Sequence, residues 1–321
     1  MWVGVSAALG AGLLWGLIFI VPLVLGDYPG VVLAFGRYTA FGILALGLAW
    51  VDRSVLVKLS RADWIEAVKL SLVGNIFYYA TLASAIQLAG APMPTLIIGT
   101  LPVVIAVSAN LLDRRSGRVD RVVEWRRLAL PLTLIFSGLM VVQFGPAHAG
   151  DLTASVAGDY LAGLGLAVLA VACWTWYPIR NSRWLQARPP GLSRAWATAQ
   201  GLATLPLALL TGLAYAAWER FAGPGNADFN WPFGPQPLLF VSLMAMTGLA
   251  ASWLGTLLWN KASHLLPAAL LGQLIVFETL AALLYAFFWY ERLPVASELV
   301  GIVLLVGGVL LGVRIFRVRA G

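Results

Sequence analysis

The sequence predicts an all-α integral membrane protein with ten transmembrane helices. Of its 321 residues, 60% are hydrophobic and only 11% are charged, whereas about 25% of the residues of a soluble domain are charged. The mean hydropathy is +0.86. Apolar runs long enough to cross a bilayer, which takes roughly 20 residues, recur along the whole chain. These observations exclude a water-soluble globular fold.

The apolar runs define the ten predicted spans, because an α-helix is the only open-ended structure that satisfies its own backbone in lipid. The first run has no basic segment before it and no small-residue cleavage motif, which favours a retained span over a signal peptide. The loop 219–236 is rich in Gly, Pro and aromatic residues, and we expect it to cap the bundle at the membrane interface. The spans cover residues 2–25, 30–51, 63–86, 92–112, 125–145, 158–180, 194–218, 237–260, 267–290 and 294–316.

Basic residues predict the orientation of the chain. They gather after the second, fourth and sixth spans and at the C-terminus, whereas the loops on the other side hold few. Cytoplasmic loops of membrane proteins are enriched in Lys and Arg, so we expect both termini in the cytoplasm. The longest of these basic segments, 113–124, fits a solvated connector. The basic residues outside this pattern are Arg37, Arg220 and Arg292.

Composition also argues against several classes of partner and cofactor. The isoelectric point near 9.9 could suggest nucleic acid, but the basic residues form short clusters and no single patch. One cysteine, Cys173, excludes an intramolecular disulfide and a cysteine-based zinc site. His148 and His264 are isolated near loops and do not indicate a metal site or a proton relay. We therefore predict no cofactor, no metal and no nucleic-acid partner.

Recurring features divide the chain into two halves of five helices. Trp15 in the first span matches Trp174 in the sixth, and prolines open both the fourth span, at Pro92 and Pro94, and the ninth, at Pro267. An odd number of spans per half places the halves in opposite orientations, so we expect a 5+5 inverted repeat around a central cavity. The predicted units are the first repeat at 1–145, a loop at 146–157, the second repeat at 158–316 and a tail at 317–321.

Several segments stand out in order along the ten spans, namely Leu13–Pro22, Phe35–Tyr38, Leu101–Val103, Trp174, Glu291-Arg292 and Gly301–Val309. Taken together, they resemble the EamA-type drug/metabolite transporter superfamily over the whole chain. The aromatic-rich segments Tyr78-Tyr79 and Cys173–Pro178 resemble more particularly the YddG-type aromatic amino acid exporters. Two residues depart from the family pattern: Asp113 replaces a usual Gly-Glu, and Glu278 lies near a usual proline.

The resemblance implies a basket of ten helices with a central cavity that works by alternating access in a bacterial inner (plasma) membrane. It implies export of small organic metabolites, with aromatic amino acids (Phe, Tyr, Trp) and their analogues as the favoured substrates. A multidrug or other metabolite exporter of the same superfamily is the alternative. We expect a monomer or a weak homodimer in the lipid bilayer.

Candidate binding residues in the first half come from helical spacing, because residues three and four apart share a face. Asn75, Tyr78 and Tyr79 form one stripe that could stack a ring and hold a polar group, although tyrosine hydroxyls also bond neighbouring helices. Trp15 and Phe19 form a second stripe. That stripe also contains Gly12 and Gly16, whose spacing is a motif for helix packing, so a pure packing role is the alternative.

In the second half, Trp174 and Tyr177 share a face, and the adjacent Pro178 frees a backbone carbonyl near them. Trp253 lies beside a polar stripe formed by Ser252, Thr256 and Asn260, which is hard to place against lipid. Gln273 lies beside the face that carries Glu278. We predict that Trp174, Tyr177, Trp253, Gln273 and Glu278 contribute to substrate binding.

Glu278 is the only acidic residue deep inside a predicted span. A charge in hydrocarbon costs about 3 kcal/mol on insertion scales, so it persists mainly where a function or a partner requires it. Glu278 could bind a substrate ammonium, carry a proton or form an ion pair with Arg37. Arg37 could instead extend its side chain to the membrane interface. Because no second embedded acid occurs, uncoupled or weakly coupled export is favoured over proton antiport.

Two other classes of membrane protein fit the sequence less well. A membrane-embedded prenyl- or phosphotransferase needs paired aspartates to hold magnesium, and no DxxxD or DDxxD motif occurs. A channel needs rings of like residues or a filter of backbone carbonyls, and no such motif occurs. We therefore predict a transporter and not an enzyme.

Overall fold

The computed structural model describes residues 1–89, 92–118, 122–143, 157–221 and 229–320. Within these ranges every regular element is helical and no strand occurs, as the composition predicted. His148 and almost all of the predicted loop at 146–157 lie outside the described residues, as does part of the loop 219–236.

Three helical stretches of the first half contain a break or an irregular turn. The first is α1 (Trp2–Gly16), the 3₁₀ turn η1 (Leu17–Phe19) and α2 (Val21–Val24). Then come α3 (Gly30–Leu56) and a stretch made of α4 (Arg61–Ser71), the π-helical segment η2 (Leu72–Phe77) and α5 (Tyr78–Ala89). The rest of this half is α6 (Pro92–Gly99), α7 (Leu101–Arg115) and α8 (Trp125–Gln143). Of these stretches, α3 and α8 are continuous.

The second half begins with two long helices, α9 (Ala157–Gln186) and α10 (Ser193–Phe221). The next stretch is again interrupted by a π-helical segment, and consists of α11 (Pro237–Thr247), η5 (Gly248–Leu254) and α12 (Gly255–Leu265). A break at Ile275 separates α13 (Ala268–Leu274) from α14 (Val276–Trp289), and α15 (Ala296–Ala320) ends the chain.

Eight helical stretches in the described ranges are long and apolar enough to cross a membrane. They correspond to the predicted spans 1, 2 and 5 to 10. The predicted third and fourth spans, formed here by α4–η2–α5 and by α6 and α7, are helical but are not among the eight. Length and composition thus support eight of the predicted spans as candidates to cross the membrane, and the count of ten stays a prediction.

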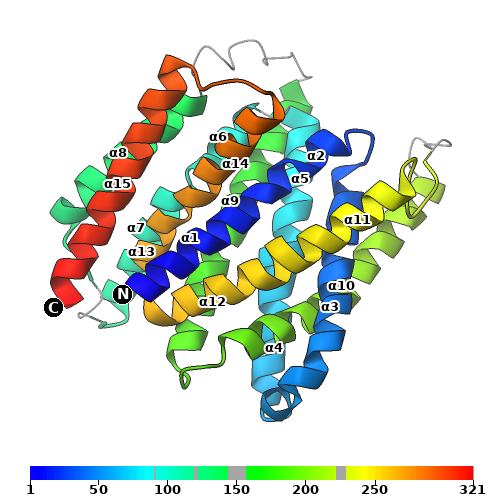
Figure 1. The fold of residues 1–321 in the computed structure, drawn as a ribbon, viewed down its shortest axis with the longest axis horizontal. Coiled ribbons are helices and arrows are strands. Elements are labelled where there is room, and N and C mark those ends of the chain that lie inside the picture. Colours follow the sequence, from blue (N-terminus) through cyan, green and yellow to red (C-terminus); the bar gives the residue numbers. More distant parts are fainter. Residues whose placement is uncertain (90–91, 119–121, 144–156, 222–228, 321) are drawn as a thin grey trace.

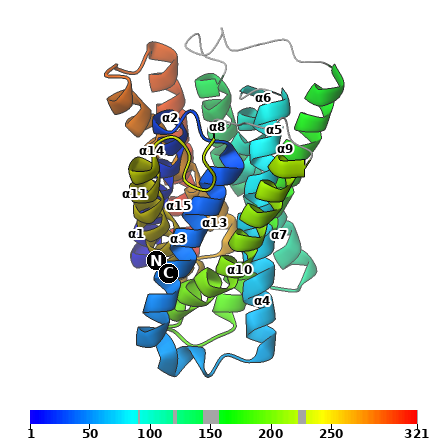
Figure 2. The same cartoon turned by 90° about the vertical axis from the view of Figure 1, so that its right-hand side faces the viewer.

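Figures 1 and 2 show long helices side by side, with the two chain ends close together. Helices of the first half pack mainly against helices of the second. The largest contacts join α3 with α10, α8 with α15, α5 with α9, α1 with α12 and with α14, and α7 with α13. The interior of the bundle is therefore formed by both halves together.

Small residues bring α1 close to α14. A Cβ atom added to Gly12 would lie 3.0 Å from the backbone nitrogen of Glu278, and one added to Gly16 would lie 2.7 Å from Cβ of Ala281. The spacing of these two glycines therefore serves helix packing, as the alternative interpretation expected. The same contact places Glu278 beside the helix that carries Trp15.

One end of the bundle, where α3 ends and α4 begins, is closed by a layer of ion pairs. Each carboxylate side chain is at most 10% exposed and faces an arginine from another segment. The pairs connect α3 with α10, and α4 and α7 with α9 or the residues just after it. We call these four pairs the ion-pair layer: Asp52–Arg194, Asp63–Arg188, Glu66–Arg180 and Asp113–Arg183.

Candidate functional site

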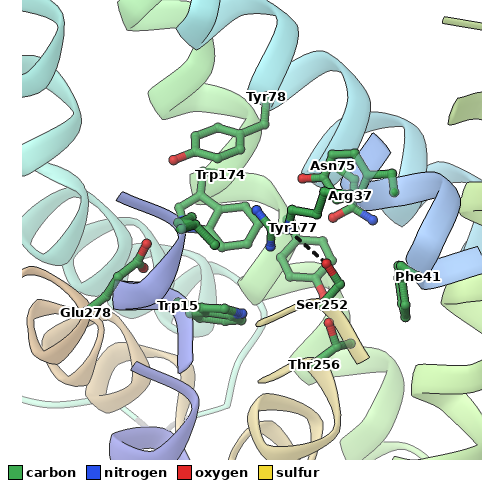
Figure 3. Close-up of a pocket in the computed structure, with 13 residues that line it drawn as sticks. Trp15, Arg37, Phe41, Asn75, Tyr78, Trp174, Tyr177, Ser252, Thr256 and Glu278 are labelled. Carbon is green, nitrogen blue, oxygen red and sulfur yellow. Dashed lines mark hydrogen bonds between the residues drawn. The ribbon is translucent and has the colours of Figure 1, made fainter. Parts of the chain in front are cut away.

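A cavity lies where the interrupted helices of the two halves meet (Figure 3). About 30 Å³ of it is open to water, which is room for about two water molecules. Its walls come from α1, η1, α3, η2, α5, α9, η5, α12 and α14. The lining residues are Trp15, Ile18, Arg37, Tyr38, Phe41, Gly74, Asn75, Tyr78, Trp174, Tyr177, Ser252, Thr256 and Glu278.

Three stacked rings form one wall of the cavity. Trp174 lies between Tyr78 and Tyr177, with ring centroids 4.9 Å apart on each side and interplanar angles of 21° and 2°. Figure 3 shows Tyr78 and Trp174 near the centre of the site. Aromatic pairs in such arrangements contribute about 0.5–1.5 kcal/mol beyond the burial of their area. The stack is therefore a preformed apolar surface on which a further ring can pack.

Trp15 forms the opposite aromatic surface. Its ring meets Trp174 edge-on at 5.8 Å and Trp259 at 5.1 Å. Its indole Nε1 donates a hydrogen bond of 2.8 Å to the backbone carbonyl of Ala251 in η5. The bond fixes the ring and satisfies a carbonyl inside the π-helical segment, where the regular hydrogen-bond ladder is disturbed.

The stack is held from behind by a buried polar network. The hydroxyl of Tyr177 donates to Oε1 of Gln200 at 2.9 Å, and Nε2 of Gln200 donates to Oδ1 of Asn181 at 3.3 Å. Asn181 in turn donates to Asn260 at 2.8 Å and accepts from Trp196 at 2.9 Å. Because each buried polar group in this network has a partner, the network fixes the position of the stack.

The two π-helical segments shape the cavity. In η2, Gly74 lies directly against the ring of Tyr177, and the neighbouring Asn75 donates to Thr204 Oγ1 at 3.1 Å. In η5, Ser252 faces the cavity from the other half. Single π-helical turns inside long helices often mark functional sites, and discontinuous helices surround the binding sites of many transporters.

Arg37 supplies a positive charge to the cavity. Its Nε donates a hydrogen bond of 2.9 Å to Ser252 Oγ, and its guanidinium lies 5.2 Å from the ring centre of Tyr38. The side chain therefore points into the site and not toward the membrane interface. Its Nη groups make no hydrogen bond within the described residues and are free to donate.

Glu278 supplies the negative charge. It lies in the first turn of α14, where the helix dipole favours an anion. The ion pair with Arg37, one of the three roles considered for Glu278, does not form: across the described part of the chain, the Glu278 carboxylate makes no ion pair and no hydrogen bond. Figure 3 shows Glu278 and Arg37 on opposite sides of the site, with Trp15 and Trp174 between them in this view.

The structure brings together Trp15, Arg37, Asn75, Tyr78, Trp174, Tyr177 and Glu278 from the predicted set. Phe19 is outside the lining and 47% exposed, because the tighter 3₁₀ turn of η1 rotates it away from the stripe of Trp15. Tyr79 follows Tyr78 directly and therefore faces elsewhere on the helix, where it meets Tyr38 edge-on at 6.5 Å.

Two predicted residues of the second half also lie outside the lining. Trp253 donates from Nε1 to Thr198 Oγ1 at 3.3 Å. Gln273 is fully buried before the break at Ile275, and its amide lies against Gly312 with no hydrogen bond within the described residues. Trp253 lies inside the π-helical segment η5 and Gln273 just before the break at Ile275, where side-chain directions depart from those that regular spacing predicts.

The spacing argument missed Ile18, Tyr38, Phe41 and Gly74, although Phe41 is four residues from Arg37 and the pair could have been found on that basis. Ser252 and Thr256 line the cavity, as their polar stripe suggested. Asn260, from the same stripe, belongs to the network behind the stack. No cluster of three or more metal-ligating side chains occurs in the described ranges.

A small cavity of aromatic and charged side chains, enclosed by apolar interrupted helices, is the arrangement of a membrane transporter. Residues 2–117 match the EamA-like transporter family. The chain is 48% identical over 312 residues to the inner membrane protein YtfF of Escherichia coli (strain K12), covering 97% of this chain and 95% of the relative. It therefore belongs to the EamA-like transporter family, within the drug/metabolite transporter superfamily, and is a multi-pass inner membrane protein.

A solved crystal structure shares the fold. It superposes with a TM-score of 0.75, covers 99% of both chains and is 17% identical in sequence. At this identity the likeness concerns the arrangement of helices alone.

Proposed function

We propose that the protein exports small organic metabolites across the inner membrane, with aromatic amino acids and their analogues as its principal substrates. The observation that carries the proposal is the stack of Tyr78, Trp174 and Tyr177 in a cavity that also contains the charges of Arg37 and Glu278. A flat ring packs on the stack, and charged groups of both signs are available to its polar substituents.

The size of the cavity supports transport by alternating access. Space for about two waters is far too small for an aromatic amino acid, so the aromatic walls must separate before a substrate enters. Trp15 belongs to the first helix of the first half, and the three-ring stack combines Tyr78 of the first half with Trp174 and Tyr177 of the second. A movement of one half against the other therefore opens the site.

The contacts between helices support the proposed 5+5 repeat with ten spans. If the two halves are related by a two-fold axis, span 1 corresponds to span 6 and span 3 corresponds to span 8. A contact between spans 1 and 8 then requires a matching contact between spans 6 and 3. The structure contains both contacts, α1 with α12 and α9 with α5. The π-helical segments η2 and η5 also occupy matching places, in spans 3 and 8.

The ion-pair layer lies at the end of the bundle that the basic residues assign to the cytoplasm. We propose that both termini lie on that side. Reporter fusions after Gly321 and in the loop near residue 149 test this orientation: the first should report the cytoplasm and the second the periplasm. The reverse result would contradict the proposed topology.

The substrate class is tested with purified protein in proteoliposomes that are loaded in turn with each amino acid. We expect efflux of Phe, Tyr and Trp well above that of Leu or Ala, and acceleration by substrate on the other side, which carriers show and channels do not. Trp174→Ala should abolish the preference for aromatic substrates. Trp176→Ala is the matched control, because Trp176 lies two residues away on the exposed side of α9.

Equal efflux of aliphatic and aromatic amino acids would contradict the aromatic site. Efflux of aromatic cations without amino acids would instead favour a multidrug exporter, since rings and a carboxylate together also bind cations. We further propose that export is uncoupled or only weakly coupled to protons. At a fixed substrate gradient, an imposed pH gradient should then change the initial rate little or not at all. Accumulation driven by the pH gradient in wild type and lost in Glu278→Gln would contradict this and make Glu278 the coupling residue.

A further inference from the structure

Two opposite charges line one small cavity without pairing with each other. Arg37 donates its Nε to Ser252, which leaves the outer edge of the guanidinium unused, and the Glu278 carboxylate has no hydrogen-bond or ion-pair partner among the described residues. A charge at membrane depth normally pairs with another or serves a function. Here both are kept apart and both face the space that a substrate enters.

We propose that Arg37 binds the carboxylate and Glu278 the ammonium of a zwitterionic substrate, and that the two residues together select α-amino acids over singly charged aromatic compounds. This inference rests on the proposed function and adds the roles of the two charged residues to it. A guanidinium presents two parallel N–H groups that match a carboxylate, and a carboxylate accepts from an ammonium.

The arrangement leaves both charges available to an α-amino acid group. Arg37 and Glu278 make no direct ion pair, yet both line the same cavity. An α-amino acid group carries its ammonium and its carboxylate on one carbon, and each forms charged hydrogen bonds of about 2.7–2.9 Å. Once the aromatic walls have separated, such a group can contact both side chains, which do not contact each other.

The aromatic surfaces place the rest of such a substrate. Trp15 and Trp174 lie between the two charges in Figure 3, with the stack of Tyr78, Trp174 and Tyr177 beside them. A ring one carbon away from the charged group can pack on this surface. Ser252 acts as a positioning residue, because its hydroxyl accepts from the inner Nε of Arg37 and so directs the Nη groups outward.

Three probes of the same shape test the inference: phenylalanine, phenethylamine, which lacks the carboxylate, and 3-phenylpropionate, which lacks the ammonium. Their affinities for the purified full-length protein are measured by tryptophan fluorescence and by calorimetry. We expect wild type to bind phenylalanine roughly 10–100-fold more tightly than either of the others, since one hydrogen bond to a charged group is worth that much.

Two variants test the binding of the substrate carboxylate and of the substrate ammonium separately. Arg37→Gln should reduce the affinity for phenylalanine to that for phenethylamine and leave phenethylamine unaffected. Glu278→Gln should reduce it to that for 3-phenylpropionate and leave 3-phenylpropionate unaffected. Arg220→Gln is the matched control, because Arg220 is exposed at the far end of α10 and should change none of the three affinities.

The wild-type measurement alone decides the inference if a variant fails to fold. Equal affinities for the three probes overturn the roles of Arg37 and Glu278 but leave an aromatic binding site, and so leave the proposed function standing. Tight binding of phenethylamine alone also overturns them. If wild type binds none of the three probes, the proposed function fails and the inference fails with it.

Discussion

Replacing Gly74 by alanine tests whether η2 must lack a side chain at the position where it packs against the aromatic stack. A Cβ atom at Gly74 would lie 2.3 Å from Cδ2 and 2.6 Å from Cγ of Tyr177, far inside contact distance. These atoms belong to the base of the ring, and the ring cannot swing away, because it is stacked on Trp174 and its hydroxyl is bonded to Gln200.

The expected cost follows from that geometry. Overpacking a well-packed interior costs about 1–3 kcal/mol, whereas Gly→Ala within a helix gains up to about 1 kcal/mol from backbone propensity. Gly47→Ala is the matched control, because Gly47 lies in α3 and an added Cβ there meets nothing within 4 Å. The difference in unfolding free energy between the two variants isolates the overpacking, and we expect it to be about 1–3 kcal/mol.

Unfolding in mixed micelles, followed by tryptophan fluorescence, measures this difference, and phenylalanine binding reports the site. Gly74→Ala should also weaken binding, because displacing Tyr177 disrupts the stack. In a Tyr177→Gly background all three close contacts of the added methyl group, with Cδ2, Cγ and Cβ of Tyr177, are absent, so Gly74→Ala should then resemble Gly47→Ala. If Gly74→Ala is as stable as Gly47→Ala in the otherwise wild-type protein, the close approach of η2 to α9 is wrong.

Two further predictions concern the polar contacts around the site. Asn181→Leu removes the partners of Trp196 Nε1, Asn260 Oδ1 and Gln200 Nε2, so it should destabilise the protein by about 1–3 kcal/mol per lost partner; the same unfolding assay measures this, and an unchanged midpoint would contradict the network. Asp52→Asn weakens the bonds that this carboxylate accepts from Arg194 at 2.7 and 2.8 Å. Because the Arg194 side chain is 54% exposed and keeps much of its hydration, we expect a loss of only about 1–3 kcal/mol, and a loss above about 5 kcal/mol would show a fully buried pair.

The helical spans could be predicted from the sequence because hydrophobicity along a single segment decides whether it crosses lipid. The same local reasoning found part of the site. Trp174 and Tyr177 lie on a regular stretch of α9, so their spacing gave their common face correctly. Trp15 was found for the same reason, since it precedes the change of helix type at Leu17.

The errors occur where the helix type changes. Phe19 was placed on the face of Trp15 by a period of 3.6 residues per turn, but it ends a 3₁₀ turn with about three residues per turn. Trp253 lies inside the π-helical segment η5, where the side-chain directions again depart from the α-helical pattern. Neither irregular segment has a distinct local motif, because contacts far along the chain stabilise it. Trp15 Nε1, for example, donates to the carbonyl of Ala251 across 236 residues.

The partners of the two charges could not be derived from the sequence for a related reason. Arg37 bonds Ser252 across 215 positions, and nothing in either local sequence links them. The general cost of a charge in lipid singled out Glu278, which lines the cavity, and suggested a pairing with Arg37 as one possibility. It did not anticipate that the helix start at Val276 gives Glu278 a favourable electrostatic environment without an ion pair.

The places of the two π-helical segments connect the site to the proposed movement. Under the proposed repeat, η2 meets the first helix of the second half through Gly74 and Tyr177, and η5 meets the first helix of the first half through Ala251 and Trp15. Both crossings hold the aromatic walls of the cavity by a close steric fit, because a Cβ atom added to Gly255, directly after η5, would lie 2.7 Å from Nε1 of Trp15. The crossing of α1 with η5 adds the hydrogen bond from Trp15 to Ala251. The proposed movement of the halves therefore has to separate Trp15 from η5 and Tyr177 from η2, and each separation displaces one aromatic wall of the cavity.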